Sequence, residues 1–204
     1  MATSLLSTKL YRPQPPAGLV PRSRLIKRLD EDAAKKVLLI SAPAGFGKTT
    51  ILSAWIQERK LPAAWLSLDA EDNDPTQFLI YVVAALRAVN SDFGGTPLAL
   101  LQATPPTPLQ DVLVALINEL AEIPNDSYLF LDDYHLIETE EVHTALAYLV
   151  EHLPQKIHIT FSSRSDPPLP LSRLRARGQL AEMRQADLRF TPEEAASFLN
   201  QTCH

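Results

Sequence analysis

A short turn in the first quarter of the chain carries the residue types that bind phosphate. The run A-P-A-G-F-G-K-T, which begins at Ala42, follows the phosphate-binding loop pattern G-x-x-x-x-G-K-[ST] except at the first glycine. Gly45 and Gly47 permit backbone conformations closed to other residues, so successive N–H groups can point at phosphate oxygens. Lys48 supplies a positive charge for the β- and γ-phosphates, and the hydroxyl of Thr49 can ligate Mg²⁺. The alternative is a strand–helix turn that binds nothing, but the order of strand, loop and helix favours a nucleotide site.

A second motif lies at the end of the apolar run that starts at Tyr128. This run ends in two carboxylates, Asp132 and Asp133, which is the Walker-B pattern. Asp132 is expected to hold Mg²⁺ directly or through water, and Asp133 to orient the attacking water. An Asp at the second position is one methylene shorter than the more common Glu, so slow hydrolysis is expected. The alternative is a strand that ends in a polar turn, which the upstream phosphate loop disfavours.

A third candidate follows another apolar run, 156–161, which ends in Ser162, Ser163 and Arg164. Polar residues at the carboxyl end of a strand lie where open α/β sheets bind ligands. Arg164 is therefore a candidate sensor of the γ-phosphate. A single arginine is a weak signal, and the alternative is a surface side chain.

The elements that must position these residues alternate between strands and helices. Residues 37–41 are apolar without alternation, as expected of a parallel strand that is covered on both faces. Three further strands are expected at 63–68, 128–133 and 156–161, and helices at 49–60, 76–90, 109–123 and 139–153. The pattern predicts a P-loop NTPase fold, a three-layer α/β/α domain with a mostly parallel five-stranded sheet. The strand that precedes Arg164 is expected to lie between the phosphate-loop strand and the Walker-B strand.

The remaining segments predict three divisions of the chain. Residues 1–32 form an arm and a short helix, 33–190 the ATPase core, and 191–204 the start of a truncated helical lid. Within the core, 69–74 is expected to be a solvated loop, and 91–108 a long loop or irregular hairpin. Asp74 should cap the helix that follows the solvated loop, with Pro75 as its first residue. A short helix is expected at 169–178, one or two short strands at 179–190, and a capping box from Thr191 to Glu194 that opens the last helix.

Composition limits the classes of function. The net charge of −5 argues against a surface that coats nucleic acid, and the arginines between 173 and 189 are interspersed with acidic residues. Direct binding of nucleic acid by this segment is therefore not expected. One cysteine, Cys203, excludes a disulfide framework. No run reaches 18 apolar residues, which predicts a cytoplasmic chain with no membrane span.

The motifs occur with further runs that are distinctive in combination. They are T-K-L-x-R-P from Thr8, V-P-R-S-R-L from Val20, W-L-S-L-D and D-N-D-P from Trp65 to Pro75, L-D-D-Y-H-L-I from Leu131, S-S-R from Ser162, and L-R-F-T with E-A from Leu188 to Ala195. Together they resemble, over nearly the whole chain, the nucleotide-binding domain of the MalT-type, large ATP-binding LuxR-family transcriptional regulators. These regulators are STAND-class signalling ATPases.

That resemblance implies a switch that binds ATP or ADP with Mg²⁺ and takes part in regulating transcription. ATP together with an inducer would favour self-association, and slow hydrolysis would reset the switch. Carried over to this sequence, the residues that contact nucleotide are Ala44, Gly45, Phe46, Gly47, Lys48, Thr49, Thr50, Val20, Pro21 and Arg22. The backbone of the last three would border the adenine, Thr49 and Asp132 would hold the metal, and Lys48, Asp133 and Arg164 would be catalytic.

Two other interpretations stay open at this point. One is an ATPase or phosphotransferase of steady turnover, and the other is a truncated fragment that binds nucleotide weakly. Regulators of the resembled class continue into helical, sensor and DNA-binding domains, which these 204 residues lack. DNA binding and inducer sensing are therefore not assigned to this segment. No N-K-x-D guanine motif occurs, which disfavours a GTPase.

Overall fold

The computed structural model describes residues 5–15 and 18–202, and a five-stranded sheet in which all neighbouring strands are parallel lies at its centre. Pro16 of the predicted arm and Cys203 fall outside the described residues. The strands are β1 (Val37–Ser41), β2 (Ala63–Ser67), β3 (Ser127–Asp132), β4 (Ile157–Ser163) and β5 (Leu180–Arg184). Their order in the sheet is β2-β3-β4-β1-β5. The prediction that the strand preceding Arg164 separates the other two motif strands is therefore confirmed.

The strand order decides where the two motifs meet. From β1 the chain passes to β2 at one edge of the sheet, and from β4 it passes to β5 on the other side of β1. The order thus reverses between β1 and β4, and a crevice opens at such a point beyond the carboxyl ends of the strands. The phosphate loop follows β1, the Walker-B carboxylates follow β3, and Arg164 follows β4.

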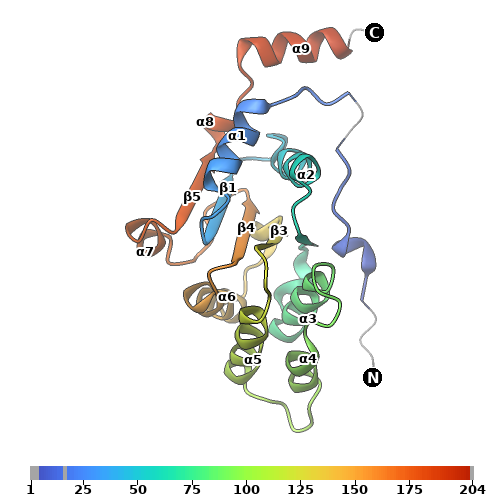
Figure 1. Ribbon diagram of the computed structural model, residues 1–204, viewed down its shortest axis with the longest axis vertical. Helices are drawn as coiled ribbons and strands as arrows, with labels where there is room; N and C mark the ends of the chain where they lie inside the picture. The colour runs from blue at the N-terminus through green and yellow to red at the C-terminus, as the bar shows by residue number, and fades with distance from the viewer. Residues whose placement is uncertain (1–4, 16–17, 203–204) are drawn as a thin grey trace.

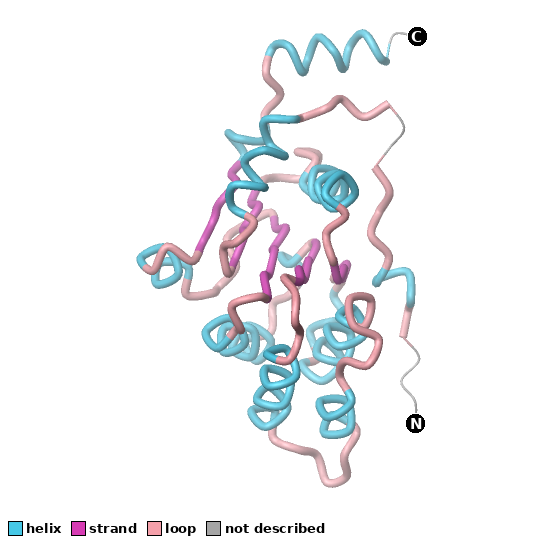
Figure 2. The backbone as a smooth tube through the Cα atoms, viewed as in Figure 1, coloured by secondary structure: helices cyan, strands magenta, loops and turns pink. Residues whose placement is uncertain are grey.

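One face of the sheet is covered by α1 (Ser23–Asp32) and α2 (Lys48–Arg59), which lie together above the strands in Figures 1 and 2. Their apolar side chains form one core cluster with the sheet. Trp55 is at the centre of this cluster with 1% of its surface exposed, and its ring meets Phe130 edge-on. Its indole N–H donates a 2.8 Å hydrogen bond to Asp30. Trp55 is therefore a core residue that joins the two helices.

The other face is covered by α3 (Pro75–Leu86), α5 (Leu109–Ala121) and α6 (Glu140–His152), which lie below the strands in Figure 1. An additional helix, α4 (Gly95–Leu101), packs outside them, so the prediction of a loop or hairpin over 91–108 was wrong. Tertiary contacts explain the helix. The carboxylate of Glu119 on α5 accepts hydrogen bonds from the N–H groups of Gly94 and Thr96, which satisfies free donors at the start of α4. The leucines of α4 pack against the core.

The segment 69–74 also differs from the solvated loop that its composition predicted. Ala70–Asn73 forms a 3₁₀ helix, η2, and Asp72 within it is fully buried. The N-terminal arm causes this burial, because Lys9 of the 3₁₀ helix η1 (Ser7–Leu10) donates a 2.5 Å hydrogen bond to Asp72. The predicted cap is confirmed, since Asp74 accepts a 2.7 Å hydrogen bond from the N–H of Gln77.

After β4 the chain forms α7 (Leu171–Ala176), β5, and the short helix α8 (Gln185–Leu188). The segment 179–190 therefore holds one strand and a helical turn. The predicted capping box is confirmed, because Thr191 and Glu194 exchange hydrogen bonds of 3.0 and 3.2 Å. It opens α9 (Pro192–Thr202), which lies at the end of the molecule beyond α1 and α2 (Figure 1). No helix in the described part of the chain is long and apolar enough to cross a lipid bilayer.

Candidate nucleotide-binding site

The phosphate loop connects the buried end of β1 to the first turn of α2. Gly45 and Gly47 have φ angles of +83° and +73°, and a Cβ atom at either position would meet nothing within 4 Å. Backbone conformation rather than space therefore requires glycine at both positions. Gly47 is the N-cap of α2, a helix of 12 residues, so the free N–H groups and positive end of that helix face the loop. The loop has the features of an anion-binding turn.

Lys48 lies at the start of α2 and is buried. Its Nζ donates hydrogen bonds of 2.9 and 3.1 Å to the carbonyl oxygens of Ala42 and Pro43. Burial lowers the pKa of Lys48, while the carboxylates of Asp133 and Asp132 act in the opposite direction. The ammonium group is thus held in the phosphate loop by neutral carbonyls, which an anionic ligand can replace.

Asp132 connects the Walker-B strand to the phosphate loop. Its Oδ2 accepts a 2.8 Å hydrogen bond from the hydroxyl of Thr49, whereas its buried Oδ1 makes no hydrogen bond. Burial raises the pKa of Asp132, and the hydroxyls of Ser162 and Thr49 partly offset the rise. A hydroxyl and a partly unpaired carboxylate are ligands that suit Mg²⁺, which usually completes its octahedron with water and substrate phosphates. The residues present therefore fit this ion.

Asp133 and Arg164 border the same region. Asp133 has a φ of +57°, and 46% of its side chain is exposed. Its charge and that of Arg164 both act on Lys48. The structure therefore brings Asp133 and Arg164 to the same end of the sheet as Lys48, Thr49 and Asp132, so that all five predicted catalytic and metal-binding residues lie there. It adds His135, which the sequence reasoning missed as a site residue although it lies in the L-D-D-Y-H-L-I run.

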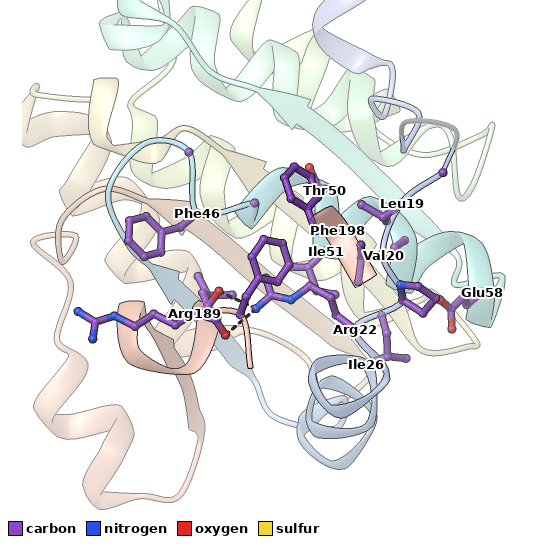
Figure 3. A pocket seen from close by; sticks show the side chains of 17 residues that line it. Leu19, Val20, Arg22, Ile26, Phe46, Thr50, Ile51, Glu58, Arg189 and Phe198 are labelled. Carbon is purple, nitrogen blue, oxygen red and sulfur yellow. Dashed lines mark hydrogen bonds between the residues drawn. The ribbon is translucent and has the colours of Figure 1, made fainter. Parts of the chain in front are cut away.

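Beside the loop there is a cavity of about 680 Å³ with mostly apolar walls. Figure 3 shows Val20 and Ile26 of the N-terminal region, Ile51 of α2 and Phe198 of α9 around it. Of the ten residues predicted to contact nucleotide, seven line this cavity: Val20, Pro21, Arg22, Gly45, Phe46, Gly47 and Thr50. Ala44 is exposed and does not line it, and Lys48 and Thr49 face the Walker-B side instead.

Arg22 has a larger part in this cavity than the prediction for its backbone implied. Its buried guanidinium donates hydrogen bonds of 2.6 and 3.0 Å to the carbonyl oxygens of Leu188 and Arg189 (Figure 3). It also lies 4.7 Å from the ring centre of Phe190 and 3.5 Å from the carboxylate of Glu194. One side chain thus joins the N-terminal arm to the C-terminal wall. Phe190 and Phe198 were missed because they are remote in sequence from the loop.

The sequence of the chain was compared with those of known proteins. No protein-family model matches the chain. It is 36% identical to the HTH-type transcriptional regulator MalT of Serratia proteamaculans over 196 residues, which are 96% of this chain and 22% of the relative. The MalT proteins of Yersinia enterocolitica and Vibrio cholerae are 35% and 32% identical over the same shares. The chain thus spans about a fifth of the length of these curated relatives.

Solved structures agree on the fold. A STAND protein with a tetratricopeptide repeat sensor from Pyrococcus horikoshii superposes with a TM-score of 0.59 at 15% identity, over 95% of this chain and 26% of that one. Cdc6p from Pyrobaculum aerophilum gives the same TM-score at 13% identity, over 97% and 53% of the two chains. At these identities the likeness concerns the fold alone, which is the P-loop NTPase fold. The chain is similar over nearly its whole length to one segment of MalT regulators.

Proposed function

We propose that this MalT-like P-loop domain is a switch module that binds ATP or ADP with Mg²⁺ and hydrolyses ATP slowly. One observation carries the proposal more than any other. The hydroxyl of Thr49 and the carboxylate of Asp132, from motifs 83 residues apart, meet at 2.8 Å beside a loop whose N–H groups are free to bind phosphate. A strand–helix turn without a ligand has no need of that carboxylate.

In this proposal the backbone from Ala44 to Thr50 binds the phosphate oxygens, and Lys48 leaves its two carbonyl partners to contact the β- and γ-phosphates. Thr49 and Asp132 hold Mg²⁺, which when bound neutralises charge on the phosphates. The positive charge of the ion also offsets the cost of ionising the buried Asp132, whose pKa is raised by burial.

The adjoining cavity is proposed to take the base. Its apolar walls and size suit a flat heterocycle, and the backbone from Val20 to Arg22 offers hydrogen-bonding groups at its rim. Adenine is the expected base, because MalT relatives and the P-loop neighbours favour an ATPase and the sequence lacks a guanine motif. Phe46, whose side chain follows the loop glycine, forms part of the wall.

Slow hydrolysis follows from the residues at the Walker-B end. Asp133 is proposed to orient the attacking water, and Arg164 to contact the γ-phosphate. The Asp133 side chain is short and half-exposed, and it has no hydrogen bond from a neighbouring side chain in the described part of the structure. A poorly fixed carboxylate orients water weakly, so turnover should be low. Low turnover suits a switch better than an enzyme of steady flux.

A switch needs domains that respond to it. The MalT relatives are about five times longer than the matching segment, so helical, sensor and DNA-binding domains are the proposed partners within a longer chain. Regulation of transcription, a cytoplasmic location and ATP-dependent self-association belong to that longer protein. Direct binding of nucleic acid is not proposed for this segment.

Calorimetric titration with ATP, ADP and GTP, each with and without Mg²⁺, tests the proposal. Adenine-selective binding that needs Mg²⁺ for ATP, with turnover far slower than nucleotide exchange, is the expected result. Steady turnover at a rate typical of metabolic enzymes would favour the ATPase or phosphotransferase interpretation instead. Absence of binding, unchanged by Lys48→Ala, would leave the chain as a fragment without a working site.

A further inference from the structure

His135 lies in the 3₁₀ helix η3 (Tyr134–Leu136), directly after the Walker-B carboxylates. Contacts on both sides fix this turn. Tyr134 is buried, and its hydroxyl lies 2.8 Å from Nδ1 of His143 on α6. Asn73 donates a 3.0 Å hydrogen bond to the carbonyl of Leu136 and accepts one of 2.9 Å from the N–H of Thr139. The backbone that carries the His135 ring is therefore held in place.

The imidazole of His135 makes no hydrogen bond. Only 12% of the side chain is exposed, and both ring nitrogens are shut off from solvent without a hydrogen bond. A buried polar atom without a partner costs roughly 1–3 kcal/mol. Such a cost in a fixed turn calls for an explanation, and a ligand that supplies the missing partner is one.

Other unpaired groups lie at the same end of the sheet. Oδ1 of Asp132, at the end of β3, and Oγ of Ser162, near the end of β4, are also buried without a hydrogen bond of good geometry. Four of the seven such atoms in the described part of the chain therefore belong to His135, Asp132 and Ser162. The Ser162 hydroxyl is close enough to Asp132 to lower the pKa of that carboxyl, so these two groups can serve each other, whereas neither ring nitrogen of His135 makes a hydrogen bond.

The charges around the ring identify the kind of ligand. Asp133, Arg164, Lys48 and Asp132 all act on His135, and the nearest carboxylate oxygen, Oδ1 of Asp133, lies 3.8 Å from Nδ1. Burial lowers the pKa of His135 below its ordinary value, with Arg164 and Lys48 acting in the same direction. A small turn of the half-exposed Asp133 side chain would bring its carboxylate to Nδ1–H and leave Nε2 for a second partner. That partner must be a hydrogen-bond acceptor if both nitrogens are to donate, and a phosphate oxygen is the acceptor that the neighbouring phosphate loop would bring.

We propose that His135 donates a hydrogen bond to the terminal phosphate of bound ATP, so that this residue lets the site distinguish ATP from ADP. The inference rests on the proposed function, because it assumes that Lys48 and Asp132 hold a nucleotide. The imidazolium form then bridges the Asp133 carboxylate and the phosphate. The half-exposed Asp133 side chain can turn toward Nδ1, and the exposed Arg164 side chain can turn toward the same phosphate. ADP lacks the terminal phosphate and leaves His135 unpaired.

The first test compares affinities for Mg²⁺ with ADP and with the non-hydrolysable analogue AMP-PNP. His135→Phe keeps the ring and removes both nitrogens, and it should weaken AMP-PNP binding by roughly tenfold or more, as expected for a hydrogen bond to a charged group. Affinity for ADP should not change. His135→Asn keeps an N–H donor and should recover part of the loss.

The matched control is His158→Phe, the same change in a buried histidine at the start of β4, whose Nδ1 already has a partner, the carbonyl oxygen of Lys35. It should leave the ratio of the two affinities unchanged. A merely structural role for His135 would lower both affinities together, and that result would overturn the proposal. An unchanged ratio with slower hydrolysis would also overturn it, and would assign His135 to the attacking water instead.

Proton uptake gives a second readout that does not depend on turnover. Titration of AMP-PNP in PIPES and in Tris near neutral pH, whose ionisation enthalpies differ, reports protons bound with the ligand. The wild-type chain should take up more protons with AMP-PNP than His135→Phe does, and the two should agree with ADP. If the wild-type chain binds neither nucleotide, the proposed function fails as well. If it binds both and His135→Phe changes neither readout, only this inference fails.

Discussion

The hydroxyl of Thr49 donates a 2.8 Å hydrogen bond to the carboxylate of Asp132. This contact joins the two nucleotide motifs across the sheet, from the first turn of α2 to the end of β3. It orients the Asp132 oxygens before any metal binds, which reduces the reorganisation that a ligand would require. The metal ligands of the proposed site are thus already in contact with each other.

Lys48→Ala should abolish tight triphosphate binding, because the ammonium is the proposed contact for the β- and γ-phosphates. The domain should remain folded, since the Lys48 Nζ bonds only two loop carbonyls that solvent can reach once the side chain is removed. Calorimetry measures the affinity and circular dichroism the fold. Lys36→Ala is the matched control, because burial also lowers the pKa of Lys36, at the opposite end of β1. An unchanged ATP affinity in Lys48→Ala would contradict the assignment of this turn as a phosphate-binding loop.

Asp132→Asn should weaken the Mg²⁺ dependence of ATP binding, because the amide lacks the charge that the metal needs. Calorimetric titration at several Mg²⁺ concentrations measures this dependence. Asp126→Asn removes a carboxylate at the other end of β3 that is mostly exposed, and should behave like the wild type. Identical metal dependence in the two variants would count against the Walker-B assignment.

Asp132→Asn should also stabilise the chain in the absence of nucleotide. Burial raises the pKa of Asp132 in the folded chain, so ionisation of this carboxyl favours the unfolded state. The free energy of unfolding is therefore highest at acid pH. It falls as the pH rises from the ordinary pKa of 3.8 through the raised pKa of the folded chain. Above the raised pKa that cost is present in full, and Asp132→Asn removes it. The melting temperature should rise by roughly 2–4 °C for each kcal/mol recovered. A lower melting temperature at neutral pH would contradict this account of the buried charge.

Glu194→Gln should loosen α9 from the core. The Glu194 carboxylate accepts hydrogen bonds from Arg24 and from the N–H of Thr191, and Arg22 lies 3.5 Å away. Hydrogen–deuterium exchange should therefore increase in α9, while Glu122→Gln, the same change at an exposed glutamate after α5, leaves it unchanged. Equal protection of α9 in the two variants would show that the carboxylate does not hold the helix.

Low pH should loosen α9 from the core, as Glu194→Gln does. Burial acts to raise the pKa of Glu194, but the hydrogen bonds from Arg24 and Thr191 and the charge of Arg22 outweigh it and hold the pKa below 4.5. The stabilisation is therefore complete above that ordinary value and is lost as the pH falls through the lowered one. Exchange in α9 measured against pH should rise only below about pH 4.5 in the wild type, and Glu194→Gln should abolish that step.

Lys9→Met should destabilise the chain by about 3 to 5 kcal/mol, the usual cost of breaking a buried ion pair. It keeps the length of the side chain but leaves the fully buried Asp72 without its cation. Urea denaturation measures the loss, and Lys27→Met on the exposed face of α1 is the control. The double variant with Asp72→Asn should recover part of the stability. A loss below 1 kcal/mol would mean that the pair is solvated.

Local sequence determined most of the elements and the identity of the motif residues. A glycine with positive φ, an Asp cap before Pro75 and the Thr191–Glu194 box act within a few residues, so their effect can be read without knowing the fold. The apolar runs around Val37 and Tyr128 predicted buried strands for the same reason. These features predicted the class of fold, and they assigned Lys48, Thr49 and Asp132 to the correct elements.

Only the tertiary structure decided which distant residues meet. Nothing near Asp72 predicts a buried ion pair with Lys9, and nothing near Gly95 predicts a helix whose start is capped by Glu119. The Arg22 guanidinium beside Phe190, and the unpaired ring of His135, likewise depend on contacts between remote segments. Burial and pairing are properties of the packed chain, because the free energy of a charge depends on the groups that surround it in space. The sequence therefore supplied the chemistry of the site, and the packing of the arm, α9 and the η3 turn supplied its walls and partners.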